Sequence, residues 1–314
     1  MPGLVYTLSD SGKGMMGPWI VERDGTLVQL ANKPDPALSP DRGQLAYSRD
    51  GDIWVLDILT GVEKNLTNSY DVIEDRCQWW PARPGLIVFH YRIRGDDRYA
   101  AGYLARIQSD GTNYYIIDGQ VGGHSRAALS PDGRSIVYDR DGKPWIFRFG
   151  EGRSEIPSAS FPEHFGLAAD PTWSPDSGRV AWLLYGLSEG SGDSTATAVL
   201  DLGGITAALL HRFPAADGND AGSGHLAWSP DGAWLATANP SEKTDDGETT
   251  LWVMRPDGSE EIRLGAGDYP VWSPDGAMLV YQNREGVSAV KPGNWIPFTI
   301  TLPASARVVD WITF

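Results

Sequence analysis

Three features of the sequence predict an all-β protein made of repeated four-stranded units. A Trp or Leu followed by Ser-Pro-Asp recurs along the chain, and a short apolar strand follows each copy. The 314 residues include 37 Gly and 22 Pro, scattered as expected for many short strands joined by tight turns. The two ends of the chain look like complementary parts of one such unit. Together these features predict a ring of β-sheets that both ends of the chain close.

The first feature is a corner that is repeated five times. The copies are "LSPDRG" at Leu38, "LSPDGR" at Leu129, "WSPDSG" at Trp173, and "WSPDGA" at Trp228 and Trp272. Proline presets φ for the first central position of a turn, Asp tolerates the next, and Gly takes the positive φ that closes it. The segment "QWWPARPGLIVFH" is a degenerate sixth copy. A large, rigid Trp at this corner suits packing between two sheets.

The segments between the corners also repeat. Each corner leads into an apolar strand, then a polar loop, and then a third strand such as "DIWVLD", "PWIFRF" or "TLWVMRP". Tight turns such as "SDGT" and "PDGS" lead to a fourth strand. Four short antiparallel strands in a unit of about 45 residues are typical of a β-propeller blade.

The two ends of the chain predict how the ring closes. The start, "MPGLVYT" to "LVQLA", supplies second, third and fourth strands, and the end, "ARVVDWITF", supplies a first strand with Trp311. A closed ring leaves no bare sheet edge between its first and last blades. We therefore predict one domain, a seven-bladed β-propeller closed by the C-terminal strand, with six blades as the alternative. The expected units are 1–34 with 306–314, 35–70, 75–119, 124–160, 169–214, 224–266 and 268–303.

These repeats, with "LVY"- or "IVY"-like strands and endings such as "NLT" at Asn65, resemble those of TolB-type β-propellers. The resemblance covers essentially the whole chain and implies the propeller fold. Such repeats occur in the periplasmic Tol translocation protein, in gating propellers of prolyl-oligopeptidase-like enzymes and in bacterial envelope proteins. The chain shows neither the N-terminal α/β domain of the first nor the hydrolase domain of the second. The resemblance implies a periplasmic or extracellular bacterial location, although the first residues do not read as a signal peptide.

Composition and charge narrow the range of partners. The chain carries 41 Asp and Glu against 26 Lys and Arg, a formal charge of −15. Such a surface repels phosphate backbones, so we expect no nucleic-acid partner. No apolar run reaches the roughly 18 residues of a membrane span. A protein, a peptide or a glycan remains as partner, and we expect a monomer.

Motifs for catalysis are weak. Gly186 to Gly190 match G-x-S-x-G, but they lie in an expected loop between strands instead of a strand-to-helix turn. The five histidines form no close metal-binding pair: His90, His124, His164, His211 and His225. The single cysteine, Cys77, excludes an internal disulfide and is expected to be a buried strand residue.

The clearest candidate site is the mouth of the central channel, because the first strand of each blade lines the axis of a propeller. We expect a ring formed by the residues three or four positions before each corner, with two close neighbours: Asp35, Asp75, Arg76, Arg126, Asp170, His225, Asp268 and Arg307, with Glu74 and His124. Gathered carboxylates attract a cation or a basic side chain. Calcium suits oxygen ligands, with Asp75, Asp170 and Asp268 as candidates. Alternatively, the interleaved arginines make the ring a structural belt of salt bridges.

Two functions are consistent with this sequence. The first is a non-catalytic binding or scaffold module that presents a loop-rich acidic face and the channel to a protein, peptide or glycan. The alternative is a metal-dependent propeller enzyme, a lyase or hydrolase, whose residues converge in the channel. The dispersed histidines and the absence of a nucleophile motif favour the binding module.

Overall fold

The computed structural model describes residues 2–10, 14–21, 27–33, 37–96, 101–122, 127–161, 164–188, 193–213, 224–300 and 306–313. Only the backbone is described for the parts before residue 37 and after residue 300. In these ranges the regular structure is β-strand, apart from a single short 3-10 turn at Ser158–Ser160. The all-β class predicted from the sequence is confirmed.

Five separate antiparallel sheets of four strands each account for most of the described strands. The first contains β28 (Ala306–Thr313), β1 (Pro2–Asp10), β2 (Gly14–Val21) and β3 (Leu27–Lys33). The second contains β4 (Ala37–Leu38), β5 (Gln44–Arg49), β6 (Asp52–Asp57) and β7 (Glu63–Asn65). The third contains β16 (Leu167–Trp173), β17 (Arg179–Ser188), β18 (Asp193–Asp201) and β19 (Thr206–Phe213). The fourth contains β20 (His225–Trp228), β21 (Leu235–Lys243), β22 (Thr249–Met254) and β23 (Glu261–Ala266). The fifth contains β24 (Asp268–Trp272), β25 (Leu279–Asn283), β26 (Gly286–Val290) and β27 (Phe298–Ile300).

The remaining strands form one eight-stranded sheet with two halves. One half contains β8 (Val72–Trp79), β9 (Leu86–Ile93), β10 (Gly102–Gln108) and β11 (Tyr115–Val121). The other contains β12 (Ala128–Leu129), β13 (Ser135–Arg140), β14 (Lys143–Arg148) and β15 (Gly152–Glu155). The halves are joined where Val121 of β11 pairs with Arg140 of β13. Counting the halves separately gives the seven predicted units, and counting them together gives six.

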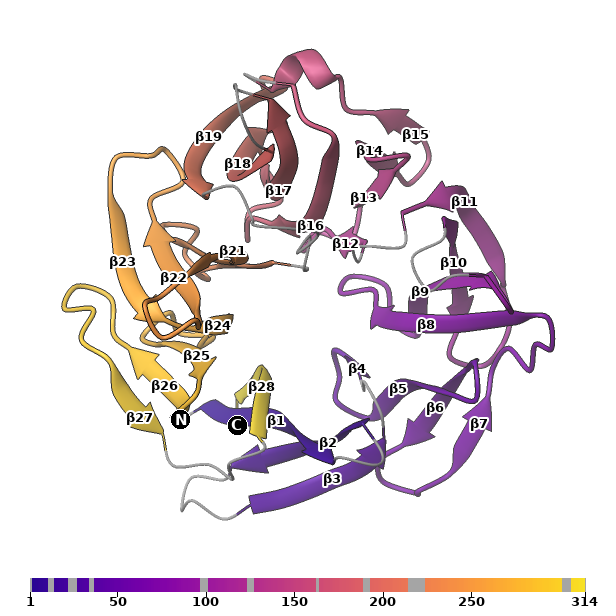
Figure 1. The fold of residues 1–314 in the computed structure, drawn as a ribbon. Helices are drawn as coiled ribbons and strands as arrows, with labels where there is room; N and C mark the ends of the chain where they lie inside the picture. Colours follow the sequence, from indigo (N-terminus) through magenta and orange to yellow (C-terminus); the bar gives the residue numbers. More distant parts are fainter. Residues whose placement is uncertain are drawn as a thin grey trace.

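The sheets are arranged as a ring (Figure 1). Strands β4, β12, β16, β24 and β28 lie toward its centre, and β3, β7, β15, β23 and β27 lie toward its rim. The N- and C-terminal strands are neighbours, because β28 pairs with β1 from Pro2↔Thr313 to Leu8↔Ala306. This pairing gives β1 a partner along its inner edge and is the closure that the sequence predicts.

The repeated corners adopt one local structure. In each the Ser hydroxyl donates to the Asp carboxylate two residues later at 2.5–2.7 Å and accepts from the backbone N–H five residues later at 2.9 Å. The hydrogen bond from Ser273 is the main reason why the pKa of Asp275 lies below its usual value, and Asp41 and Asp231 behave alike. The expected Gly has positive φ, and Arg42 (φ 62°) and Ser177 (φ 60°) take its place in two copies.

The corner residue sets the register of each sheet. Trp79 pairs with Ile87, Trp173 with Val180, and Trp272 with Leu279. The partners of these tryptophans are buried, and the apolar clusters lie between neighbouring sheets, as where Val137 and Ile146 of one half-sheet pack with Trp173 and Val180 of the next sheet. Cys77 is buried on β8, as expected.

Candidate functional site

The predicted ring lies on the first strands of the sheets, and the structure describes a part of it. Glu74, Asp75 and Arg76 lie on β8, Asp170 on β16, His225 on β20 and Asp268 at the start of β24. Asp35, His124 and Arg126 lie outside the described residues, and Arg307 is described only as backbone within β28. The ring prediction can therefore be compared with the structure for six residues.

Three of the first strands contain the same β-bulge next to the residues predicted at the channel mouth. The ladders shift register between Asp75 and Gln78, between Ala169 and Thr172, and between Asp268 and Val271. At the same position, three residues before the corner Trp, positive φ occurs at Arg76 (54°), Asp170 (51°) and Tyr269 (52°). A non-glycine residue in this conformation costs about 1–3 kcal/mol. Such bulges re-aim a side chain, and they often lie next to functional sites.

Sequence reasoning missed these bulges and the ring residue Tyr269. Two of the three bulged residues are followed by proline, Pro171 and Pro270. Proline has no N–H for the ladder, so inside a sheet it is confined to edges, strand starts and bulges. Pro171 and Pro270 are therefore the features of the sequence from which two of the three bulges could have been predicted.

His225 and Asp268 join two neighbouring sheets. His225 Nδ1 lies 2.7 Å from Asp268 Oδ1, and the same oxygen accepts from the backbone N–H of Tyr269 at 2.8 Å. The Tyr269 ring packs against the imidazole with centroids 3.9 Å apart. The side chains of His225 and Asp268 are 26% and 23% exposed, so the pair is shielded but accessible. When Nδ1 donates to Asp268, Nε2 is the acceptor nitrogen of a neutral ring.

Tyr185, on the strand next to Asp170, makes a second contact between sheets. Burial raises the pKa of Tyr185 above its usual value, and the charge of Asp170 adds to the effect. The Tyr185 hydroxyl accepts from the backbone N–H of Gly224 and from Nδ2 of Asn239, both at 3.3 Å. Polar contacts therefore link the sheets that begin with β16, β20 and β24.

The acidic residues on β8 have internal partners. Asp75 accepts from the Arg92 guanidinium at 2.8 Å, and Arg76 Nε lies 3.9 Å from its other oxygen. Glu74 is only 2% exposed. Burial raises its pKa, a hydrogen bond from Thr67 opposes the rise, and the charge of Asp52 adds to it. Glu74 is thus a buried acid behind the ring, and this part of the ring resembles the predicted salt-bridge belt.

The other candidates for chemistry are dispersed. Among the described residues no group of three or more His, Cys, Asp and Glu is placed to hold a metal ion, so a calcium site at Asp75, Asp170 and Asp268 stays a prediction. The G-x-S-x-G match begins at Gly186 inside β17, and the next described element is another strand, β18. Within the described residues no helix has the length and apolar character of a membrane span.

Comparisons with known proteins give the fold. No family model and no curated protein matches the sequence. Among solved structures, an oligogalacturonate lyase in complex with manganese matches with a TM-score of 0.66 and 16% identity, over 90% of this chain and 84% of that one. Oligogalacturonate lyase from Vibrio parahaemolyticus matches with a TM-score of 0.68 and 12% identity, over 94% and 88%. TolB from Acinetobacter baumannii matches with a TM-score of 0.55 and 18% identity, over 83% of this chain.

The ring of antiparallel sheets and these matches define the protein as a β-propeller. Its fold is similar to that of TolB, which is consistent with the resemblance of the repeats in the sequence. The chain spans 63% of the length of the TolB structure. The structural neighbours include enzymes as well as TolB, so likeness of fold leaves activity open.

Proposed function

We propose that the protein is a non-catalytic binding module that receives a basic group of a protein or peptide partner at the ring. The observation that carries this proposal is the bulge shared by β8, β16 and β24. At this bulge Arg76, Asp170 and Tyr269 adopt a positive φ, which costs free energy in a residue other than glycine. A formal charge of −15 draws a cationic partner toward the protein.

A basic side chain fits this ring better than a divalent ion does. Asp75 and Asp268 are each in contact with a different cationic or proton-donating side chain, Arg92 and His225. A calcium ion needs six to eight oxygen ligands converging on one point. An ammonium or guanidinium group needs only hydrogen-bond acceptors along its path, which partly exposed carboxylates supply.

The enzyme alternative has one observation in its favour, the His225–Asp268 pair. An imidazole oriented by a carboxylate is the arrangement of a general base. Two of the structural neighbours are oligogalacturonate lyases, whose named substrate is a polyanion. An acidic ring repels a polyanion, so a substrate of this chain would be neutral or cationic. Turnover of uncharged oligosaccharides that is lost in His225→Gln would establish this alternative.

The test of the binding function is the double substitution Asp170→Asn with Asp268→Asn. Binding of a lysine- and arginine-rich peptide is measured by calorimetry, and we expect the affinity to fall at least about tenfold, or 1.4 kcal/mol. The control is Asp245→Asn with Asp246→Asn, which removes the same charge from exposed positions of a turn. Equal affinities for the two folded variants would show that the ring is not the site.

A further inference from the structure

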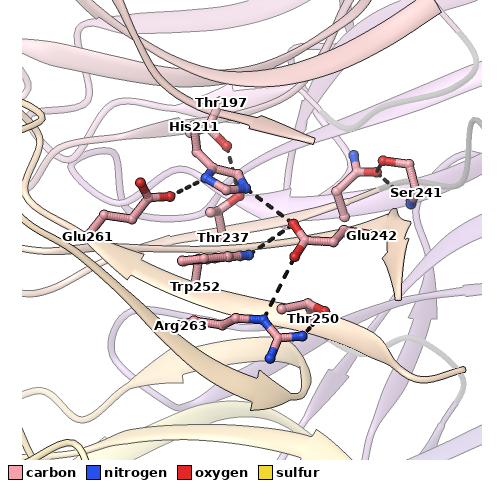
Figure 2. Close-up of polar contacts among 10 residues, drawn as sticks. Thr197, His211, Thr237, Ser241, Glu242, Thr250, Trp252, Glu261 and Arg263 are labelled. Carbon is pink, nitrogen blue, oxygen red and sulfur yellow. Dashed lines mark hydrogen bonds and ion pairs between the residues drawn. The ribbon is translucent and has the colours of Figure 1, made fainter. Parts of the chain in front are cut away.

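A polar network at His211 joins two neighbouring sheets and contains none of the residues predicted at the channel mouth (Figure 2). His211 lies on β19, the last strand of its sheet, and its partners come from β21 and β23 of the next sheet. The Nε2 atom of His211 is 3.2 Å from Glu242 Oε2, and its Nδ1 atom contacts Glu261 Oε1. Both ring nitrogens therefore face carboxylates.

The centre of the network is shielded from water. The side chains of His211 and Glu242 are 11% and 15% exposed. The imidazole packs against the rings of Phe213 and Trp252, with both centroids at 4.6 Å. The Trp252 indole also donates to Glu242 Oε2 at 3.0 Å. These contacts hold the imidazole and the Glu242 carboxylate in one orientation.

With Glu242 and Glu261 both ionised, the charges of the network balance when His211 carries two protons. A neutral imidazole has one donor and one acceptor nitrogen, whereas an ionised carboxylate only accepts. The charged groups packed around it are Glu242 from β21, and Glu261 and Arg263 from β23, with Arg263 Nε 3.9 Å from Glu242 Oε1. An imidazolium makes the sum of charges zero and donates to both carboxylates. A neutral imidazole instead directs the lone pair of its unprotonated nitrogen toward one of the two carboxylates, which repels it.

We propose that His211 is a proton-dependent clamp between the sheet β16–β19 and the sheet β20–β23. The clamp is closed when the imidazole is protonated and Glu242 and Glu261 are ionised. It loosens as rising pH removes the second proton from the imidazole, because one carboxylate then loses the hydrogen bond that His211 donated to it. The two sheets also meet through the buried Thr197–Thr237 hydroxyl contact of 2.9 Å and an apolar cluster that includes Val199 and Leu235. Neither of these contacts contains a group that changes its charge between pH 6 and pH 9.

The same chain holds a more deeply buried histidine, His90, with the opposite requirement. His90 Nε2 accepts from the backbone N–H of Ala127 at 3.3 Å. A nitrogen that accepts a hydrogen bond carries no proton, so His90 is a neutral imidazole in this arrangement. The proposal therefore assigns opposite protonation states to His90 and His211, and His90 serves as an internal reference.

The direct test is a long-range proton–nitrogen NMR spectrum of the protein with 15N-labelled histidine at pH 7.5. We expect the two ring nitrogens of His211 to show the similar shifts of an imidazolium. The nitrogens of His90 should show the widely separated shifts of a neutral tautomer. His211→Gln assigns the resonances. A neutral His211 at this pH would overturn the proposal.

A second test asks whether the clamp contributes to stability. His211→Gln keeps a polar side chain, and we expect its melting temperature to fall below that of the wild type by about 2 °C more at pH 6 than at pH 9. The control is His164→Gln at an exposed position, whose melting temperature should follow the wild type at both pH values. A loss in His211→Gln that is equal at the two pH values would contradict the clamp.

Discussion

The indole Nε1 of Trp272 donates a hydrogen bond of 3.1 Å to the carbonyl oxygen of Ala227, which lies in the first strand of the preceding sheet. The relationship recurs around the ring. Trp228 donates to Thr172 at 3.2 Å, Trp173 to Ala128 at 2.9 Å, and Trp79 to Ala37 at 2.7 Å. The corner Trp is thus both a wedge between sheets and a polar link from each first strand to the one before it.

This link predicts the effect of shortening a corner tryptophan. Trp272→Phe keeps an aromatic ring but removes the donor, and the hydrogen bond alone contributes about 1 kcal/mol. Trp182→Phe is the matched control, because Trp182 is fully buried and its indole N–H has no acceptor among the described residues. Urea unfolding should show Trp272→Phe to be the more destabilising change by about 1 kcal/mol. Equal losses in the free energy of unfolding would mean that the indole acts by its volume alone.

The corner turn predicts that two substitutions at equivalent positions change the stability of the protein in opposite directions. Arg42 has a φ of 62° where Gly276 has 68° in another copy. Arg42→Gly should stabilise the protein by about 0.5–1 kcal/mol, because glycine adopts this conformation without steric cost. Gly276→Ala should destabilise it by a similar amount, since a Cβ there meets nothing closer than 3.8 Å and only the backbone is strained.

Thermal or urea unfolding of both variants measures these changes. Arg42→Ala separates the backbone effect from the contacts of the arginine side chain, because alanine retains the strain and lacks the guanidinium. A stability of Arg42→Gly no higher than that of Arg42→Ala would contradict the argument from φ.

The buried Glu74 predicts a pH-dependent penalty. Burial raises its pKa in the folded protein, whereas in the unfolded chain the carboxyl has its ordinary pKa of about 4.3. Just above this pH the folded state still holds a proton that the unfolded chain has released. The folded state therefore loses stability as pH rises from the unfolded pKa through the folded pKa, and below both values no penalty exists. Glu74→Gln should be more stable than the wild type at neutral pH and equal to it near pH 3. Glu285→Gln, at an exposed position, should show no such crossover.

The free energy of unfolding against pH is the measurement for this prediction. If the difference between Glu74→Gln and the wild type does not change with pH, Glu74 is charged in the folded protein without a penalty.

Much of the fold follows from local sequence. The Ser-Pro-Asp corners at Ser39, Ser130, Ser174, Ser229 and Ser273 each close the expected turn, because its hydrogen bonds connect residues at most five positions apart. The closure of the ring was also predictable, since β28 and β1 are the complementary parts of one repeated sheet. The residues of the channel mouth stay a prediction, which rests on a repeat placing equivalent residues at equivalent positions.

The sequence by itself therefore determined the class, the corners and the closing strand. Only the tertiary structure decided which side chains meet. His225 contacts Asp268 across 43 residues, and His211 contacts Glu242 across 31 residues and a boundary between sheets. The bulge at Tyr269 and the burial of Glu74 were equally hidden. Hydrogen bonds inside a turn depend on neighbouring residues, whereas contacts between sheets depend on how the sheets pack and on which rotamers that packing permits.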